Sequence, residues 1–237
     1  MDQPLLSVVI PIGPEEEKLP SGLLSDLNFL PDGCELIFTV SDRHFAIENT
    51  PLSQELLSRY IVKWVITSSP GRAVQMNAGA DTASGIFLWF LHLDSRFSEK
   101  LVSRLLANLQ QHPEALHYCL LAFMRDGPLG MRLNGLGANV RSFVFGTPFG
   151  DQGLALSRAS FYHVGGYPEN VRYGEDHLFV WHSRQKGLRL RCCREYLMTS
   201  ARKYQSEGWF FLTMRYQYLW IKQAWPELTT LIKKRYF

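Results

Sequence analysis

Apolar runs alternate along the first half of the chain with stretches in which apolar or small residues recur at helical spacing. The uninterrupted apolar runs are typical of strands buried on both faces of a sheet. Strands are predicted at 5–11, 34–40, 61–66 and 87–93, and helices at 18–30, 52–60 and 72–84. This repeated strand–helix–strand order predicts an α/β domain with a largely parallel sheet and right-handed crossovers.

The second half of the chain is less regular. A helix capped by Ser98 and a strand at 116–123 continue the alternation. Residues 125–149 hold five glycines and two prolines, so we expect a loop there with a helical segment at 133–145. Further strands are predicted at 153–157, 188–192 and 197–201, and helices at 175–186 and from Ser206 to the end of the chain, interrupted at Pro226.

The strand at 87–93 is the most informative of the predicted strands, because a carboxylate follows it. The run contains His92, and Asp94 comes as soon as the run stops. Open α/β sheets bind their ligands at the carboxyl ends of their parallel strands. The sequence therefore predicts that a functional site is built around Asp94.

Composition adds bounds to this picture. The chain has 237 residues, of which 46% are hydrophobic and 20% charged, as in a globular protein with a sizeable core. We expect one domain at 1–205 and a helical extension at 206–237. No apolar run reaches the length of a membrane-spanning helix, and the first residues lack the pattern of a signal peptide, so we expect a cytoplasmic protein. The four cysteines lack metal-ligand spacing and are expected to be free thiols.

The extension differs from the rest of the chain in charge and in aromatic content. From Ala201 onward there are seven Lys or Arg and two Glu, whereas the preceding residues carry a net charge of −2. Ten of the 31 aromatic residues lie from Tyr204 onward. Such a helix could pack on the main domain, form a homodimer, or lie on the inner face of an anionic membrane. Nucleic-acid binding is not expected, because no recognition module accompanies the basic residues.

Several short motifs occur in an order that resembles family 2 glycosyltransferases of the GT-A fold. The resemblance extends over roughly residues 5–201 and is most specific at Gly71-Arg72-Ala73-Val74-Gln75-Met76-Asn77-Ala78-Gly79-Ala80, which is similar to a small, soluble bacterial subgroup. The other motifs are Ser7-Val8-Val9-Ile10-Pro11, His92-Leu93-Asp94-Ser95, Gly150-Asp151-Gln152-Gly153, Gly165-Gly166-Tyr167-Pro168 and Glu175-Asp176. The resemblance implies inverting transfer of a sugar from a nucleotide diphosphate sugar, assisted by Mg²⁺ or Mn²⁺. The acceptor is not indicated, although a lipid-linked compound or a glycan would fit.

Asp94 and His92 are the candidate metal ligands. In the family this place holds an Asp-x-Asp motif, and here His92 replaces the first acid. A divalent cation neutralises the diphosphate of the donor, and hard cations take oxygen ligands. A histidine ligand suits Mn²⁺ better than Mg²⁺. The plainer alternative is that Asp94 caps a turn and that His92 is a hydrogen-bonded core residue.

Asp176 is the candidate general base. An acceptor hydroxyl must lose its proton as it attacks the anomeric carbon, and a carboxylate is the usual base. The resemblance assigns this role to the second acid of Glu175-Asp176, with Glu175 in support. Alternatively, both acids only favour the start of the helix that follows them.

Arg72 is the first of the candidate donor-binding residues. It stands at a predicted helix start, where the guanidinium and the helix dipole both attract phosphate. Gln75 and Asn77 lie on the next turns of the same helix and could reach the nucleotide. The alternative is a solvated arginine on a helix that packs through its alanines.

The remaining candidates depend more heavily on the resemblance. It implies that Asp42 contacts the base or ribose and that Pro11 lies in the segment lining the nucleobase. Asp151 and Gln152 lie between glycine-rich turns, where they would suit the sugar or the acceptor, although Asp151 could simply bond its own backbone.

Two other functions compete with glycosyl transfer. A catalytically silent nucleotide-sugar-binding or scaffold protein would explain why His92 stands where an acid is expected. A sugar nucleotidyltransferase would need a basic, glycine-rich loop after the first strand, and the acidic segment at 13–18 argues against it.

Overall fold

The computed structural model of the chain describes residues 3–41 and 52–236. The elements of the first half are β1 (Leu6–Ile12), α1 (Ser21–Leu27), β2 (Glu35–Val40), α2 (Gln54–Arg59), β3 (Ile61–Ile66), α3 (Arg72–Thr82), β4 (Phe87–Phe90) and α4 (Glu99–Gln111). Those of the second half are β5 (Leu116–Phe123), α5 (Met131–Val144), η2 (Gly150–Gln152), β6 (Ala155–Ser157), α6 (Arg158–Val164), α7 (Glu175–Gln185), β7 (Leu190–Thr199), α8 (Arg202–Glu207) and α9 (Trp209–Tyr236).

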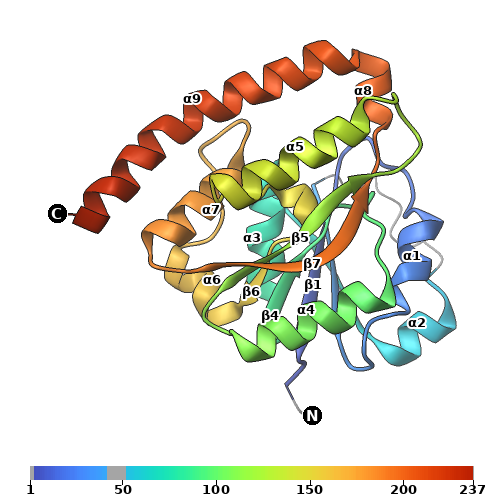
Figure 1. Ribbon diagram of the computed structural model, residues 1–237. Helices are drawn as coiled ribbons and strands as arrows, with labels where there is room; N and C mark the ends of the chain where they lie inside the picture. Colours follow the sequence, from blue (N-terminus) through green and yellow to red (C-terminus); the bar gives the residue numbers. More distant parts are fainter. Residues whose placement is uncertain (1–2, 42–51, 237) are drawn as a thin grey trace.

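The strands form one sheet with the order β3-β2-β1-β4-β6-β5-β7 (Figure 1). The short strand β6 is antiparallel to both of its neighbours, whereas the other neighbouring pairs are parallel. The six remaining described strands therefore point the same way, and their carboxyl ends meet at one edge of the sheet. This confirms the expected mostly parallel α/β fold and supplies the edge at which a site was predicted.

Helices cover both faces of the sheet because successive side chains of each strand point in opposite directions. Val8 and Ile10 of β1 belong to one apolar cluster, which also holds residues of α1 and α4. Val9 belongs to a second cluster, which holds residues of α3 and α7. The result is a three-layer α/β/α arrangement, with α5, α8 and α9 lying beyond the carboxyl edge (Figure 1).

A buried carboxylate fastens the opposite edge of the sheet. Glu35 of β2 is 1% exposed and accepts hydrogen bonds from the Ser7 hydroxyl, from Lys63 Nζ at 2.5 Å and from the Ser84 N–H at 2.8 Å. These bonds join β1, β2, β3 and the start of β4 at one point. Burial alone would raise the pKa of Glu35, but the hydrogen bonds from Lys63, Ser7 and Ser84 lower it to about 2.

The structure differs from the predicted elements in several places. The strand expected at 87–93 ends at Phe90, and His92 and Asp94 lie in the turn that follows. The helix expected from 18 begins only at Ser21, because Pro20 disfavours helical backbone before it. The two strands expected at 188–192 and 197–201 are one strand, β7, whose register shifts opposite residues 118–120 of β5.

Two helices also depart from expectation. The helix α6 was not predicted from the sequence. The predicted interruption at Pro226 is wrong, because α9 continues through this residue as one helix. Pro226 is exposed, so the carbonyl group that loses its hydrogen bond there faces water.

The C-terminal helix lies along the rest of the molecule (Figure 1). Gln223 Oε1 lies 3.1 Å from His177 Nε2, and Gln185 Nε2 donates to the Glu227 carboxylate at 2.7 Å, so α9 is held on α7. The boundary expected between 205 and 206 stays a prediction. Of the described helices, none combines the length and apolar character that crossing a bilayer requires. The four cysteines are free thiols, as expected.

Replacing Glu35 by glutamine is predicted to destabilise the fold by about 3 kcal/mol at pH 7, because Lys63 then loses its buried partner. The difference should shrink as pH falls from about 4.5 towards 2, since the lowered pKa of Glu35 stabilises the folded state only while the carboxylate is ionised. Urea unfolding measures both effects, with exposed Glu55→Gln of α2 as the control. A loss below about 1 kcal/mol would contradict this role for Glu35.

Candidate active site at the carboxyl edge of the sheet

The turn after β4 places Asp94 at the carboxyl edge of the sheet. Its Oδ2 atom accepts hydrogen bonds from the Thr199 hydroxyl at 3.1 Å and from the Ser200 N–H at 3.2 Å. Asp126 accepts in turn from the Ser200 hydroxyl at 2.6 Å and from the Ala201 N–H at 2.8 Å. The ends of β4, β5 and β7 are therefore joined around Asp94, whose Oδ1 atom receives no hydrogen bond from the described residues.

The short helix η2 brings Asp151 to the same edge. Its neighbour Gln152 is fully buried, where it accepts from the Ser142 hydroxyl at 2.7 Å and donates to the Cys119 carbonyl at 2.9 Å. Gln152 thus holds the turn in place, and the predicted contact of Gln152 with sugar or acceptor stays a prediction. Asp151 stands beside this anchor, and its Oδ1 atom is buried without a partner among the described residues.

The first turn of α7 brings Asp176 against η2. The helix starts after Gly174, which adopts the left-handed conformation with φ 82°. A Cβ atom on Gly150 would lie 2.4 Å from Asp176 Oδ2, so glycine is required there for the carboxylate to approach. The backbone of Gly150 lies close enough to this carboxylate to oppose the rise of the pKa of Asp176. Asp176 Oδ1 is buried and has no partner among the residues described.

Arg72 is the positive group that faces these acids. It is the first residue of α3, after Gly71 with φ 142°, and its side chain is half exposed. Its Nη1 atom lies 3.8 Å from Glu175 Oε1. Glu175 thus lies close to both Arg72 and Asp176, and the supporting role expected of it stays a prediction.

Burial shapes the protonation of this cluster. It raises the pKa of Asp176 to about 7; Glu175 and Asp151 raise it too, against an opposing effect of Arg72. Burial likewise raises the pKa of Asp151 to about 6, with Arg141 opposing the shift and Asp94 adding to it. Near neutral pH these acids can exchange protons, which is what general acid–base chemistry requires.

His92 is neutral in this setting. Burial, and then the charge of Arg72, lower the pKa of His92 well below its usual value. Its Nε2 atom is buried and has no hydrogen-bond partner in the described part of the chain. The alternative of a hydrogen-bonded core histidine is therefore unsupported at this nitrogen, which is left without a partner among the described residues.

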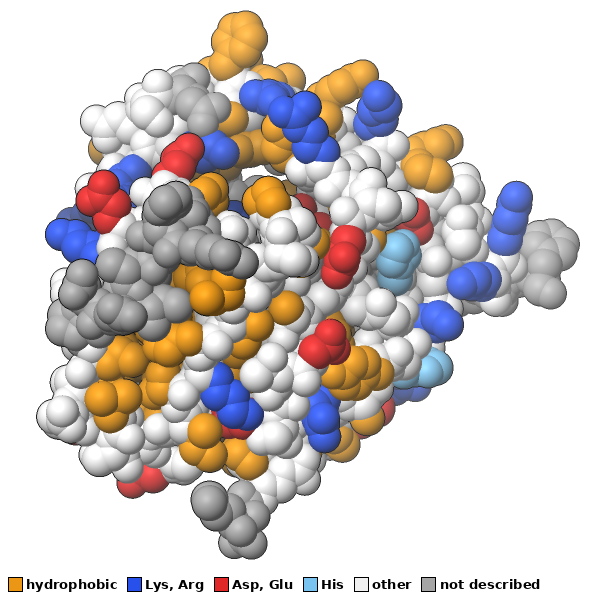
Figure 2. Space-filling view, turned by 180° about the vertical axis from the view of Figure 1, so that it is seen from behind, with side chains coloured by type: hydrophobic (Ala, Val, Ile, Leu, Met, Phe, Trp, Pro, Cys, Tyr) orange, Lys and Arg blue, Asp and Glu red, His pale blue; other side chains and the backbone are white. Residues whose placement is uncertain are grey.

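Unpartnered buried polar atoms gather at this edge of the sheet. They include His92 Nε2, Asp151 Oδ1, Asp176 Oδ1 and Arg141 Nη2. Buried polar groups without partners are rare in folded proteins, and a cluster of them indicates a place that a polar ligand completes. The space-filling view from behind shows the surface hollowed near its upper end, the end to which the carboxyl termini of the parallel strands point (Figure 2).

Gln75 and Asn77 of α3 are held in contacts within the fold. Gln75 is 3% exposed and donates to the carbonyls of Ile12 and Thr39, both at 2.7 Å, which joins the ends of β1 and β2. Asn77 donates to the Tyr167 carbonyl at 2.9 Å and accepts from the Tyr167 N–H at 2.9 Å, so it fixes the turn before α7. Their predicted contacts with the nucleotide stay predictions.

Two further residues, Pro11 and Asp42, were predicted to lie near the nucleobase or ribose. Pro11 is buried in β1, in register with Thr39 of β2. Asp42 lies outside the described residues.

Arg141 was missed by sequence reasoning. It projects from α5, is 7% exposed, and donates through Nε to the Thr147 carbonyl at 3.0 Å. Its guanidinium carbon lies 3.4 Å from the centre of the Phe149 ring and 5.9 Å from that of Trp220. Burial lowers the pKa of Arg141 to about 10, while Asp151 opposes the shift. No motif marks it, since the fold alone brings α5 over η2.

The expected metal ion requires donor atoms from side chains around Asp94. Within the described part of the chain, no group of three or more His, Cys, Asp or Glu residues could hold a metal ion. Asp94 Oδ1 and the neutral His92 Nε2 remain as free donors. Asp94 and His92 therefore stay the predicted metal ligands, and a cation held by only two protein groups would need further oxygens from a bound diphosphate.

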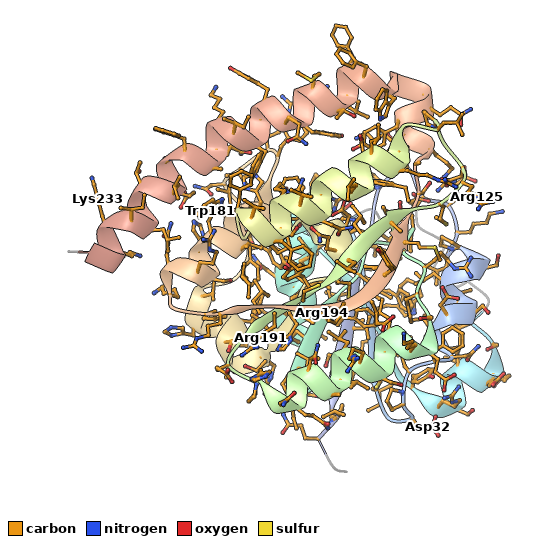
Figure 3. All side chains as sticks on the ribbon, viewed as in Figure 1. Asp32, Arg125, Trp181, Arg191, Arg194 and Lys233 are labelled. Carbon is orange, nitrogen blue, oxygen red and sulfur yellow. The ribbon has the colours of Figure 1, made fainter. Side chains whose placement is uncertain are left out.

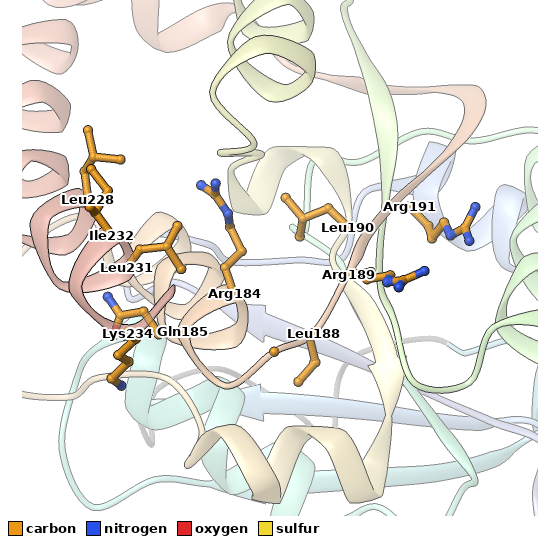
Figure 4. Close-up of a pocket in the computed structure, with 11 residues that line it drawn as sticks. Arg184, Gln185, Leu188, Arg189, Leu190, Arg191, Leu228, Leu231, Ile232 and Lys234 are labelled. Carbon is orange, nitrogen blue, oxygen red and sulfur yellow. The ribbon is translucent and has the colours of Figure 1, made fainter. Parts of the chain in front are cut away.

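The cavity drawn in Figure 4 is a separate feature, of about 880 Å³, lined by the end of α7, the start of β7 and the last turns of α9. None of the predicted site residues lines it. Arg184 lines the cavity and lies near the end of α7, whereas Asp176 lies in the first turn of this helix. With a rise of 1.5 Å per residue, the two residues are about 12 Å apart along the helix axis. Figure 3 labels Arg191, which lies in β7 near its start, and Arg125, which follows β5 near the carboxyl edge. This cavity is therefore distinct from the acidic cluster.

Replacing Asp176 by asparagine is predicted to stabilise the protein at pH 8 by about 2 kcal/mol more than at pH 5. With a pKa near 7 when folded and near 4 when unfolded, the wild-type carboxyl takes up a proton on folding between these values. Wild-type stability therefore falls as pH rises towards 7, and asparagine removes this loss. Urea titrations at both pH values measure the effect, with exposed Asp81→Asn as the control. An equal effect of the substitution at both pH values would contradict the raised pKa.

Of the comparisons with known proteins, only that with solved structures finds matches. No family model matches the sequence, and no curated protein matches it. The crystal structure of S. aureus TarS matches with a TM-score of 0.61 at 17% identity, covering 83% of this chain and 37% of TarS. The 1–349 portion of TarS in complex with UDP matches with a TM-score of 0.62 at 14% identity, covering 83% of this chain and 60% of that one. The UDP-GlcNAc complex gives a TM-score of 0.61 at 14% identity, covering 84% and 59%.

This chain thus spans less than two thirds of these structures, and identities this low show the fold alone. The fold is GT-A-like, as the sequence predicted.

Proposed function

We propose that the protein is an inverting glycosyltransferase that moves a sugar from a nucleotide diphosphate sugar to an acceptor hydroxyl, with Asp176 as the general base. The observation that carries the proposal is the buried Asp176 carboxylate at the carboxyl edge of a GT-A-like sheet. Its pKa is about 7, its Oδ1 atom is free, and Arg72 faces the same acids. The likeness to TarS, crystallised with UDP and UDP-GlcNAc, supports a nucleotide-sugar donor.

Proton transfer is the first requirement of the reaction. The acceptor oxygen forms a bond to the anomeric carbon while its proton passes to the Asp176 carboxylate. The bond between the anomeric carbon and the diphosphate oxygen breaks, and the nucleoside diphosphate leaves with that electron pair. A single displacement of this kind inverts the configuration at the anomeric carbon. A pKa near 7 suits the task, because the base is ionised in a large fraction of molecules and still binds a proton well.

Charge on the leaving diphosphate is the second requirement. Arg72, at the start of α3, supplies a guanidinium and a helix N-terminus to this anion. Asp94, with His92, would hold a divalent cation there, which when bound would neutralise part of the diphosphate charge. Asp151 lies between these groups and Arg141, where it suits the hydroxyl groups of the donor sugar or the acceptor.

The silent-binding alternative differs in one measurable respect. A silent protein would bind the donor in the same site but would catalyse no reaction, so ionisation of Asp176 would not affect donor turnover. Donor hydrolysis, in which water serves as the acceptor, separates the two functions without knowledge of the true acceptor.

Replacing Asp176 by asparagine is predicted to lower donor hydrolysis by 10²–10⁴-fold while donor affinity changes by less than about threefold. The wild-type rate should rise with pH around a midpoint near 7, because the carboxylate must be ionised to accept the proton. Calorimetry with UDP, GDP and dTDP sugars, with and without Mn²⁺, identifies the donor, and product analysis gives the rate. Asp81→Asn, at the other end of α3, controls for the loss of a carboxylate.

A companion variant tests the metal ligand separately. Asp94→Asn should weaken Mn²⁺-dependent donor binding by roughly tenfold or more and leave metal-independent binding unchanged. If no nucleotide sugar binds to the wild-type protein, the transferase proposal fails. If donors bind but the wild-type protein does not hydrolyse them, the silent-binding alternative is favoured. If Asp176→Asn hydrolyses them at the wild-type rate, Asp176 is not the general base.

A further inference from the structure

The outward side of α9 carries a row of exposed apolar side chains. Phe211 is 83% exposed and Trp225 is 69% exposed. The row recurs at intervals of three or four residues, so its members share one side of the helix. They are Phe211, Met214, Tyr218, Ile221 and Trp225. The opposite side holds the buried residues Leu212 and Ala224, so the apolar row faces away from the fold.

A similar row lies on α5. Leu133 is 65% exposed, and no acidic residue occurs anywhere in this helix. The exposed members of the row are Leu133, Leu136, Val140, Phe143 and Val144. The buried side, with Met131, Gly135 and Ala138, packs on β5, so this row also faces outward.

The two rows belong to one surface. Asn134 of α5 donates to the Thr213 hydroxyl at 2.9 Å and accepts from Trp209 Nε1 at 3.1 Å, which holds the two helices side by side. Both helices run in the same direction across the carboxyl edge (Figure 1). We call this surface the α5–α9 face. Three of its aromatic side chains, Phe211, Tyr218 and Trp225, expose on the order of 400 Å² of mostly apolar area, close to the largest patch of an ordinary monomer.

Basic residues flank the α5–α9 face. Arg215, Lys222 and Lys233 are exposed along one side of the apolar row of α9, and Arg132 is exposed on α5. None of these four forms an ion pair with a described acidic side chain. Glu227, the single acid in the sequence of α9, is turned towards α7 instead, where it binds Gln185.

We propose that the α5–α9 face is a peripheral membrane-binding surface that lies on an anionic lipid bilayer. Its aromatic and aliphatic side chains would enter the interface, and the basic flank would meet the acidic headgroups. Charge complementarity selects the bilayer over a second copy of the chain. Two copies joined through this face would bring their basic flanks together, and no described acidic side chain on the face would compensate for the repulsion.

The position of the face relative to the acidic cluster gives the proposal a consequence for the substrate. One helix, α5, presents Leu133 and its row outward and the buried Arg141 inward towards Asp151. Opposite sides of a helix are about 10 Å apart. The bilayer surface would thus lie about one helix diameter from the site, within reach of a lipid-linked acceptor. This consequence rests on the proposed function, whereas membrane binding itself does not.

Vesicle co-sedimentation of the full chain, without donor or metal, tests the proposal. Wild-type protein should bind vesicles of phosphatidylcholine with 30% phosphatidylglycerol at least tenfold more strongly than vesicles of phosphatidylcholine alone, and 0.5 M salt should weaken the binding. Phe211→Ser/Tyr218→Ser/Trp225→Ser and, separately, Leu133→Ser/Leu136→Ser/Phe143→Ser should each lower binding at least tenfold. Arg215→Gln/Lys222→Gln/Lys233→Gln should remove the preference for the anionic lipid.

The matched control is Leu57→Ser/Ile66→Ser, which removes exposed apolar side chains from α2 and β3 and should bind as the wild type does. A measurement that needs no multiple variant is quenching of tryptophan fluorescence by lipids with brominated acyl chains. Bound wild-type protein should be quenched, and Trp225→Phe should bind equally but lose most of the quenching.

Absence of wild-type binding to the anionic vesicles would overturn the proposal, as would wild-type binding by both serine variants. Light scattering that shows a wild-type dimer, converted to monomer by the α9 variant, together with no vesicle binding, would assign the face to a second copy. Failure of donor hydrolysis with intact vesicle binding would count against the proposed function only.

Discussion

The desolvation of two carboxyl groups at one edge of the sheet is the constraint on which the rest of the site depends. Burial raises the pKa of Asp151 and of Asp176, Asp94 adds to the shift of Asp151, and Asp151 adds to that of Asp176. Two guanidinium groups, those of Arg72 and Arg141, oppose this effect. Like charges held together at a buried place cost folding free energy, so the surrounding fold must hold them there.

The residues that hold this cluster are polar side chains with fixed partners. Gln152 anchors η2, Gln75 joins β1 to β2, and Asn77 fixes the turn before α7. At the opposite edge of the sheet, Glu35 is also a buried carboxylate, but each of its oxygens has a hydrogen-bond partner. Lys63 binds one oxygen and the Ser84 N–H binds the other. The contrast separates a carboxylate that stabilises the fold from one kept available for chemistry.

The sheet and the ends of its strands could be predicted from the sequence because apolar runs and glycine turns are local signals. Asp176 and Arg72 could be selected because each lies in a motif at a helix start, and the structure brings the two helix starts together. Arg141 could not be predicted, because its role depends on α5 crossing above η2, a relation between segments distant in the chain. The sequence also did not reveal that Gln75 and Asn77 bind backbone groups of the fold, because a polar residue in a motif can bond the backbone as readily as a ligand.

The helices beyond the carboxyl edge connect the site to the outer surface. Trp220 of α9 and Phe149 both lie within 6 Å of the Arg141 guanidinium, so the cover of the site and the exposed apolar face are parts of the same two helices. Pro226 lies on the exposed side of α9, where an unbonded carbonyl can be hydrated, and the helix remains continuous along the molecule.

The central claim is that Asp176 is a buried carboxyl group whose proton is exchanged near neutral pH. Carbon-13 NMR of aspartate-labelled protein, with the resonance assigned through its loss in Asp176→Asn, measures that titration directly. The structure predicts a midpoint near 7 in the free protein. A midpoint near 4, the value of an exposed aspartate, would contradict the account.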